Sequence, residues 1–208
     1  MAKHSLESLI SELQKRAEQP KRTLVGIVGA PGAGKSTLVE RLQQAVGEER
    51  CAVVPMDGYH LDNAILDAND WRMVKGAPHT FDVAGLALSL KRLAAAEEDL
   101  YLPVFDRALD LARAGALRVT TAQRLVLVEG NYLLLDQAPW NELASLFDLK
   151  VYLDVPMETL EQRLTQRWLD HGFDADMAHK KVSGNDLPNA RLVVQKTVRD
   201  TETVLLSL

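Results

Sequence analysis

The octapeptide Gly29-Ala-Pro-Gly-Ala-Gly-Lys-Ser36 constrains the fold of this chain more than any other stretch. It matches the pattern G-x-x-x-x-G-K-[ST], which binds phosphate when it links a strand to a helix. Residues 23–28 before it, TLVGIV, are apolar and largely β-branched, as in a buried parallel strand. After it, apolar residues recur at helical spacing, at Leu38, Val39, Leu42 and Val46. The pattern therefore stands in the context that it needs, and a chance match in a glycine-rich turn is the weaker interpretation.

The chemistry of phosphate binding explains each position of this loop. Glycines have no Cβ, so backbone N–H groups can wrap a phosphate that also faces the N-terminus of the following helix. We expect Lys35 to reach the β- and γ-phosphates of ATP and the Ser36 hydroxyl to bind Mg²⁺. The residues predicted to bind the nucleotide are Gly29, Ala30, Pro31, Gly32, Ala33, Gly34, Lys35, Ser36 and Thr37.

Composition and charge narrow the class of protein. With 208 residues, of which 47% are hydrophobic, the chain is long enough for one domain, spanning residues 1–208, with a single large core. A net charge of −5 gives no reason to expect a nucleic-acid partner. Cys51 is the one cysteine, which excludes an intramolecular disulfide and suits a reducing compartment.

The N-terminus predicts a helix rather than a targeting segment. It lacks the apolar stretch of about 7–15 residues that secretory signals have, and no run in the chain approaches the roughly 18 apolar residues of a membrane span. Leu6, Leu9, Ile10 and Leu13 instead share one face of a short amphipathic helix. We therefore expect a cytoplasmic protein without a membrane partner.

Residues 51–55, CAVVP, predict a second buried strand, and Asp57, Tyr59 and His60 follow its end. Because ligands gather at the carboxyl ends of the strands in an open parallel sheet, Asp57 should lie near the phosphate-binding loop. A carboxylate there can accept the proton of a substrate hydroxyl as the γ-phosphoryl group moves to it. Asp57 is the candidate catalytic base, and Tyr59 and His60 are candidate substrate contacts. The alternative is that Asp57 caps the next helix.

Residues 71–81 have no apolar period, and a helix is predicted beyond them. Asp82, just before this helix, suits an N-cap and a substrate contact equally well. Trp71 and His79 are interpreted as packing or surface residues.

Residues 100–105 and 116–120 are two short β-like runs joined by a polar link. They predict a hairpin that projects from the sheet. Asp106 and Arg107 in the link either fold over a bound substrate or form a solvent-facing ion pair, and we favour the substrate site.

Residues 125–128, LVLV, predict a third core strand that ends at Glu129. Proteins with this phosphate-binding loop place an acidic residue on the Mg²⁺ side of the nucleotide. Glu129 is therefore the candidate metal-side carboxylate, together with Ser36, and the alternative is a glutamate in a tight turn. Residues 150–155 predict a fourth strand, and residues 191–195, RLVVQ, predict the last one.

Pro156 suits the first turn of a further helix, in which Arg163 and Arg167 lie four residues apart on one face. Either they close over the transferring phosphate as part of a lid, or they form a solvated stripe balanced by neighbouring glutamates. Guanidinium groups match phosphate oxygens and can stack on adenine. We favour a lid over residues 157–186, with Arg163 as a catalytic residue and Arg167 as a nucleotide contact.

The segments GAPGAGKST, MDGYH, GAPHTFD, LPVFD and VLVEGNYLL resemble those of the P-loop small-molecule kinases that include uridine kinase, pantothenate kinase and phosphoribulokinase. With NDLPNARLV, the chain looks most similar to a branch described as fructose-transport-system kinases or nucleoside triphosphate hydrolases. The resemblance spans nearly the whole chain. It implies an α/β P-loop fold, a three-layer sandwich around a five-stranded parallel sheet, with a hairpin and a helical lid as insertions. It also implies ATP and Mg²⁺ as cofactors, Asp57 as base and Glu129 near the metal.

Two positions depart from the uridine kinases of that group. The Asp that binds the ribose in their F-D-H-P-x-x-F-D motif is matched by Gly76, and their base-reading His is matched by Asp110. The run from Lys75 to Asp82 instead has the K-G-x-P-x-x-[FY]-D shape of pantothenate kinases, which have a longer chain. These differences predict a sugar or a pantothenate-like acid as the acceptor rather than uridine or cytidine.

Two classes of function remain. An ATP-dependent kinase needs a site for a small hydroxylated acceptor, whereas a P-loop NTPase with a regulatory or switch role needs guanine-reading or partner surfaces. The chain has neither the N-K-x-D of guanine-binding proteins nor the L-S-G-G-Q of ABC-type ATPases. We therefore favour the kinase. The sequence leaves open whether the protein forms a homodimer.

Overall fold

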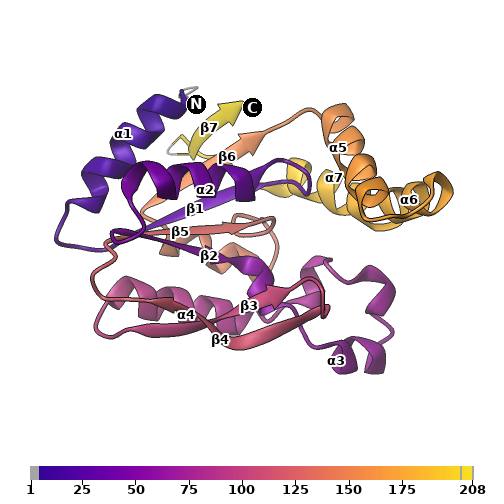
Figure 1. Cartoon of the computed structure of the whole chain (residues 1–208), viewed down its shortest axis with the longest axis horizontal. Coiled ribbons are helices and arrows are strands. Elements are labelled where there is room, and N and C mark those ends of the chain that lie inside the picture. The colour runs from indigo at the N-terminus through magenta and orange to yellow at the C-terminus, as the bar shows by residue number, and fades with distance from the viewer. Residues whose placement is uncertain (1–4, 202, 208) are drawn as a thin grey trace.

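In the computed structural model, which describes residues 5–201 and 203–207, a sheet of five parallel strands lies at the centre of the molecule (Figure 1). Its strands are β1 Thr23–Gly29, β2 Cys51–Pro55, β5 Leu125–Gly130, β6 Leu149–Asp154 and β7 Thr203–Ser207. Their spatial order is β2-β5-β1-β6-β7. A separate antiparallel hairpin consists of β3 Leu100–Asp106 and β4 Leu111–Val119. The predicted α/β class and five-stranded parallel sheet are confirmed.

Helices cover both faces of this sheet. On one face, α1 Leu6–Ala17 and α2 Lys35–Val46 pack against each other and against β5, and on the other face α4 Val83–Ala95 packs against β1. The remaining helices are α3 Asn63–Ala68, α5 Met157–Asp170, α6 Ala175–Lys181 and α7 Leu187–Lys196. Within the described part of the chain, no helix has both the length and the apolar character needed to cross a bilayer.

The middle strand β1 explains why the phosphate-binding loop is held rigidly. β1 pairs with β5 on one side and with β6 on the other, and each of its residues is buried. A parallel strand covered on both faces needs a nearly continuous apolar run, which TLVGIV supplies. The loop and α2 follow directly, and α2 buries the apolar residues that were predicted to recur on one face. The strand–loop–helix prediction is confirmed.

The predicted last strand at residues 191–195 is wrong. These residues belong to α7, whose buried Leu187, Ala190 and Val193 recur every three residues, and Pro188 occupies the first turn of the helix. The fifth strand is β7, which follows α7 and pairs in parallel with β6. The number of strands was therefore predicted correctly, but one strand was assigned to the wrong residues.

The predicted hairpin is present, with a longer second strand than expected. β4 begins at Leu111, not near residue 116, so that only residues 107–110 remain in the turn. Asp110 takes a left-handed conformation there, with φ of 53°. Asp106 stabilises the same turn, because its Oδ1 accepts hydrogen bonds from the backbone N–H groups of Ala108 and Leu109, both at 3.1 Å.

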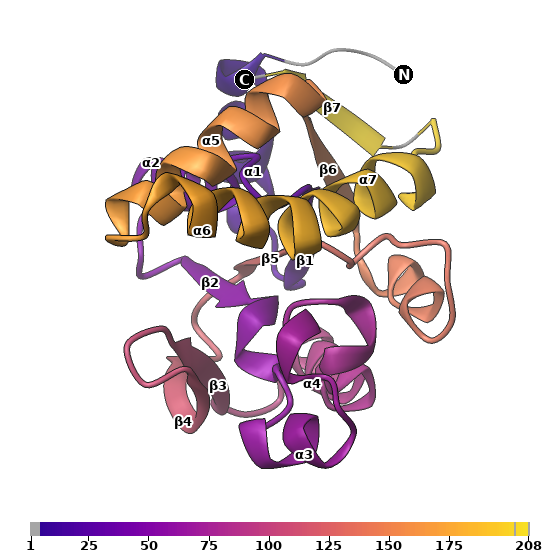
Figure 2. The same ribbon diagram turned by 90° about the vertical axis from the view of Figure 1, so that its right-hand side faces the viewer.

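The carboxyl ends of the strands bring the candidate functional segments together. The phosphate-binding loop follows β1, Asp57 follows β2, Glu129 lies at the end of β5, and the helices α5 to α7 follow β6. In Figure 2, α6 and α7 lie above this edge of the sheet, and α3 and the hairpin lie below it. This is the edge at which open parallel sheets bind ligands.

Candidate active site

The phosphate-binding loop holds its own lysine. Gly32 and Gly34 have φ of 80° and 92°, a conformation in which a Cβ would be strained, and Gly34 directly precedes α2. The Lys35 ammonium donates hydrogen bonds to the backbone oxygens of Gly29 (3.0 Å) and Ala30 (3.2 Å) and to Asn131 Oδ1 (2.7 Å). Burial lowers the pKa of Lys35, an effect that the nearby Glu129 carboxylate opposes. Asn131 was not predicted from the sequence.

Ser36 and Glu129 form a pair that suits Mg²⁺. The Ser36 hydroxyl donates to Glu129 Oε1 at 3.2 Å, so both oxygens face the same point beside the loop. Burial raises the pKa of Glu129, while Lys35 acts in the opposite direction. Among the described residues, no three His, Cys, Asp or Glu side chains gather into a metal cluster. Mg²⁺ at phosphate sites usually has only one or two protein ligands and completes its shell with phosphate oxygens and water, so this oxygen pair fits.

Asp57 occupies the 3-10 turn Met56–Tyr59, directly after β2. Its carboxylate accepts a hydrogen bond from Arg107 Nη2 at 2.9 Å, and the side chains of Asp57 and Arg107 are 29% and 72% exposed. The helix cap that was the alternative for Asp57 is supplied by Asp62, whose Oδ1 accepts from Ala64 N at 2.8 Å. The ion pair therefore joins the hairpin to the carboxylate predicted to be the base.

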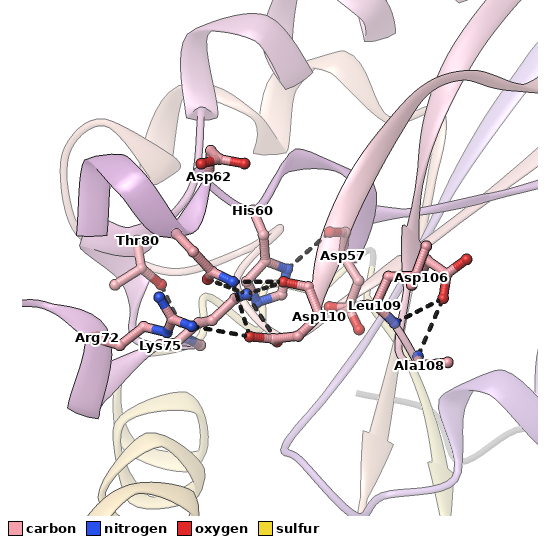
Figure 3. Close-up of polar contacts among 12 residues, drawn as sticks. Asp57, His60, Asp62, Arg72, Lys75, Thr80, Asp106, Ala108, Leu109 and Asp110 are labelled. Carbon is pink, nitrogen blue, oxygen red and sulfur yellow. Dashed lines mark hydrogen bonds and ion pairs between the residues drawn. The ribbon is translucent and has the colours of Figure 1, made fainter. Parts of the chain in front are cut away.

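His60, next to Asp57 in the same turn, packs against two aromatic rings. Its ring centroid is 4.1 Å from that of Phe81 and 4.6 Å from that of Phe105. His60 Nδ1 is 2.8 Å from the backbone oxygen of Asp57 (Figure 3). Burial lowers the pKa of His60, while Asp57 acts in the opposite direction.

Three predicted substrate contacts face away from this region. Tyr59 is buried in the core, with its hydroxyl beside Ser89 of α4 and without a hydrogen-bond partner of good geometry. Asp82 caps α4 by accepting from Gly85 N at 2.8 Å, so the N-cap is the reading that the structure supports. Asp106 stabilises the hairpin turn and pairs with Arg113 at 3.2 Å. Asp82 and Asp106 are thus bound by local backbone groups and by Arg113, and Tyr59 packs in the core.

One cavity of about 870 Å³ connects the remaining candidates. Its lining includes the loop, Asp57, His60 and Arg107, together with Arg167 from α5. A smaller hollow of about 390 Å³ lies against the loop, between Thr37 and Arg41 of α2 and Arg163 of α5. Trp71 and His79 pack edge to face at 4.9 Å and do not line either space, as their interpretation as packing residues requires.

Lys75 and Asp110 form the wall of the cavity that faces the hairpin. Lys75 Nζ donates to Asn63 Oδ1 (2.7 Å), to the Asp110 backbone oxygen (2.7 Å) and to Asp110 Oδ1 (2.8 Å). Arg72 Nη2 lies 3.9 Å from Asp110 Oδ2, and Figure 3 shows Arg72 beside Lys75. All three ammonium protons are therefore used to tie the hairpin turn to α3, an arrangement that the sequence did not reveal.

The two predicted lid arginines have different partners. Arg163 Nη1 lies 3.4 Å from the backbone oxygen of Ala33 in the loop. Arg167 Nη2 pairs with Asp186 Oδ1 at 3.2 Å, and Trp168 Nε1 donates to the other oxygen of Asp186 at 2.6 Å. Asp186 ends a short π-helical segment, Val182–Asp186, which joins α6 to α7. Such segments occur frequently at functional sites.

These features define an α/β protein of the P-loop nucleotide-binding class: the loop with its lysine, a hydroxyl–carboxylate pair beside it, and an acid at the end of a nearby strand. The sequence model of the family described as "Methylmalonyl Co-A mutase-associated GTPase MeaB" matches residues 2–60, which contain the loop and the strands β1 and β2. That match covers less than half of the chain.

Relatives match over most of the chain. "Uncharacterized protein YggC" of Escherichia coli (strain K12) is 39% identical, covering 85% of this chain and 75% of that protein. "Putative uridine kinase C227.14" of Schizosaccharomyces pombe is 34% identical, covering 93% and 87%. The crystal structure of a "putative fructose transport system kinase" from Silicibacter sp. TM1040 superposes with a TM-score of 0.89 at 42% identity over 99% of both chains. The chain belongs to the family of P-loop kinases that includes these proteins, as its motifs predicted.

Proposed function

We propose that the protein is an ATP-dependent kinase that transfers the γ-phosphoryl group to a hydroxyl of a small metabolite. The observation that carries the proposal is the shared cavity, in which Asp57 and Arg107 line the same space of about 870 Å³ as Lys35, Ser36 and Glu129. That volume is within the range of small-molecule sites, roughly 300–1,000 Å³. An NTPase without an acceptor needs only the phosphate-binding half of such a site, whereas here a carboxylate and a cation face that half.

The loop residues 29–37 bind the triphosphate through their backbone N–H groups and the N-terminus of α2. Lys35 exchanges its carbonyl partners for phosphate oxygens. Ser36 and Glu129 would hold Mg²⁺, which would neutralise phosphate charge during the transfer. We assign the smaller hollow to adenine, because the guanidinium groups of Arg41 and Arg163 line it and such groups stack on bases.

Asp57 accepts the proton of the acceptor hydroxyl. As the acceptor oxygen bonds to the γ-phosphorus, the bond from that phosphorus to the bridging oxygen of ADP breaks and the proton passes to the carboxylate. Arg107 must leave Asp57 for this, and an exposed ion pair of this kind contributes only about 0–1 kcal/mol. The released Arg107 then binds the acceptor, which we expect to be a sugar, a pantothenate-like acid or a nucleoside-like compound.

Arg163 and Arg167 belong to the lid over residues 157–186, which closes when both substrates are bound. Arg167 must exchange Asp186 for the nucleotide, because its guanidinium is paired with that carboxylate at 3.2 Å. A small-molecule acceptor as the partner and a cytoplasmic location are consistent with the net charge of −5 and the single Cys51.

The alternative function is a P-loop NTPase with a regulatory or switch role, and the GTPase family match favours it. That match ends at residue 60 and so covers the nucleotide-binding part alone. Relatives whose names contain the word kinase extend over the hairpin and the lid as well. The kinase therefore explains more of the chain.

The test is ATP turnover with and without a panel of sugars, hydroxy acids, vitamins and nucleosides. We expect at least one compound to raise turnover sharply and to yield a phosphorylated product.

Asp57→Asn keeps the shape of the side chain, so phosphorylation should fall by roughly 10²–10⁴ with little change in ATP affinity. Asp62→Asn is the matched control, because asparagine also caps helices and Asp62 does not line the cavity. Wild-type phosphorylation by the Asp57→Asn variant would contradict the assignment of the base.

A further inference from the structure

The hydrogen bond of His60 fixes which ring nitrogen carries the proton. Nδ1 is 2.8 Å from the backbone oxygen of Asp57, and a carbonyl oxygen only accepts hydrogen bonds. Nδ1 must therefore be protonated. The imidazole packs against the rings of Phe81 and Phe105, at 4.1 and 4.6 Å, which restricts its rotation. Burial lowers the pKa of His60, which favours the neutral ring. Nε2 is then a bare lone pair, able to accept a hydrogen bond but not to donate one.

Nε2 of His60 is not sealed off from solvent. In the part of the chain that the structure describes, the buried polar side-chain atoms without a hydrogen-bond partner are the hydroxyls of Tyr59 and Thr197. His60 Nε2 also has no hydrogen-bond partner among the residues that the structure describes. If it were fully buried, it would belong with these two hydroxyls, and it does not. It is therefore in contact with solvent, and His60 lines the large cavity beside Asp57.

We propose that the acceptor is a polyol in which a second hydroxyl, within two carbons of the phosphorylated one, donates a hydrogen bond to His60 Nε2. The proposal rests on the proposed kinase function and specifies its substrate class. Asp57 and His60 belong to one turn, linked by the hydrogen bond from His60 N to the Asp57 backbone oxygen at 3.2 Å. Both residues also line the same cavity, so we expect Asp57 to accept from the reacting hydroxyl and His60 from its neighbour.

Charges of both signs lie near His60. The Asp57 carboxylate acts on the ring more strongly than Lys75 and Arg107, which oppose it. Lys75 also cannot replace His60 as the group that reads this hydroxyl, because its three protons are bound to Asn63 and Asp110. The proposed acceptor carries hydroxyls, so a hydroxyl is the donor that we expect at His60 Nε2.

Kinetics with paired acceptors test the hydrogen bond directly. Each acceptor found in the panel is compared with its monodeoxy analogues. Each analogue lacks one hydroxyl, at a position one or two carbons away from the hydroxyl that is phosphorylated. We expect one analogue to lose roughly 10- to 100-fold in kcat/KM with the wild-type enzyme, the effect of leaving a polar group unpaired in a closed site. The same analogue should lose less than about 3-fold relative to the parent acceptor with His60→Asn, whose amide can keep the bond to Asp57 but has no Nε2.

A second variant guards against a simple folding defect. His60→Phe keeps an aromatic ring against Phe81 and Phe105 and removes both nitrogens, so it should show the same insensitivity to the missing hydroxyl. His79→Asn is the matched control, because His79 packs against Trp71 outside the cavity. It should retain the full wild-type discrimination between the parent acceptor and the deoxy analogue. A purely structural role of His60 would change the rates for both compounds equally.

The protonated ring nitrogen of His60 can be identified by NMR in the absence of any acceptor. Long-range ¹H–¹⁵N spectra of the labelled wild-type protein, assigned with His60→Asn, should show His60 protonated at Nδ1 alone at pH 7. Protonation at Nε2 overturns the inference, as does equal turnover of an acceptor and all its deoxy analogues. The proposed kinase function fails by a different result, namely no phosphorylated product from any compound of the panel, so the two failures are distinguishable.

Discussion

At the scale of single residues, Lys35 shows how the phosphate-binding loop is kept in shape. Its ammonium has three protons, and the oxygens of Gly29, Ala30 and Asn131 accept them. Asn131 Oδ1 is the side-chain acceptor among these three oxygens. Because each of these bonds can be exchanged for one to a charged phosphate, nucleotide binding replaces good contacts with stronger, charge-assisted ones.

Lys35→Ala should abolish phosphorylation and weaken nucleotide binding. The substitution removes a positive charge that points at the transferring group, and one such contact changes the rate by on the order of 10²–10³. Turnover and ATP affinity are measured together, with Lys91→Ala on the exposed side of α4 as the control. A variant that keeps wild-type turnover would show that the loop does not bind the reacting phosphates.

Cys51 should be unreactive in the folded protein. It lies in β2 with no exposed surface, and burial raises the pKa of its thiol from 9.0 to about 12. That shift lowers the thiolate fraction at pH 8 by roughly 10³. Iodoacetamide labelling followed by mass spectrometry should therefore be slow in buffer and fast in denaturant. Equal rates in both conditions would mean that β2 is not buried as described.

At the scale of elements, the helices α5 to α7 contact both halves of the cavity. Arg163 lies beside the loop, while Asn185 Nδ2 donates to the backbone oxygen of Lys75 at 3.0 Å on the acceptor side. Asn189 Nδ2 in turn donates to Asn185 Oδ1 at 3.0 Å. The π-helical segment Val182–Asp186 thus places its last two residues in the cavity, where each substrate can compete for their hydrogen bonds.

Hydrogen exchange across residues 163–185 should slow when an ATP analogue and an acceptor are both bound. Closure of the lid would exclude water and limit wasteful hydrolysis of ATP. The amides of β1, which are already buried in the middle of the sheet, serve as the internal control and should exchange equally slowly in every state. Unchanged exchange across the lid in the ternary complex would count against this function of α5 and α6.

The sequence predicted elements well where one periodicity dominated. TLVGIV before the loop and the spaced apolar residues of α2 each fit a single structure. RLVVQ did not, because three consecutive apolar residues suit a strand and a buried helix equally. A segment in this part of the chain is a strand only if it pairs with β6. The segment that pairs with β6 is β7, not residues 191–195. The long β4 was missed for a similar reason, since its residues are mostly exposed and show no apolar alternation.

At the scale of the whole molecule, topology explains which site residues the sequence could reveal. Asp57 and Glu129 end neighbouring strands of a parallel sheet, so their proximity follows from the strand order. Tyr59, Asp82 and Asp106 lie near the same edge, but local turns and caps direct their side chains elsewhere. The contacts of Asn131, Lys75 and Asn185 join segments far apart in sequence, for which no local pattern exists.

Contacts between distant segments also affect whether the cavity can bind a pyrimidine nucleoside as the acceptor. Gly76 has no side chain at the position where uridine kinases carry the ribose carboxylate, and its backbone oxygen already accepts from Tyr132 at 2.7 Å. Asp110, at the position of the base-reading His, has one carboxylate oxygen bound to Lys75 at 2.8 Å and the other to Asn63 at 3.1 Å. Both groups already accept hydrogen bonds within the wall of the cavity, which leaves them less free to bind a ribose or a pyrimidine.

The protein should therefore phosphorylate uridine and cytidine poorly. A site that lacks the hydrogen bonds of a substrate loses several kcal/mol of discrimination. We expect kcat/KM below about 10⁴ M⁻¹s⁻¹ for both nucleosides at saturating ATP and Mg²⁺, the low end for a physiological substrate. The best acceptor of the panel, assayed in parallel, establishes that the enzyme is active. A higher value for either nucleoside would mean that other residues of the cavity, such as His60 or Arg107, have rebuilt the pyrimidine site.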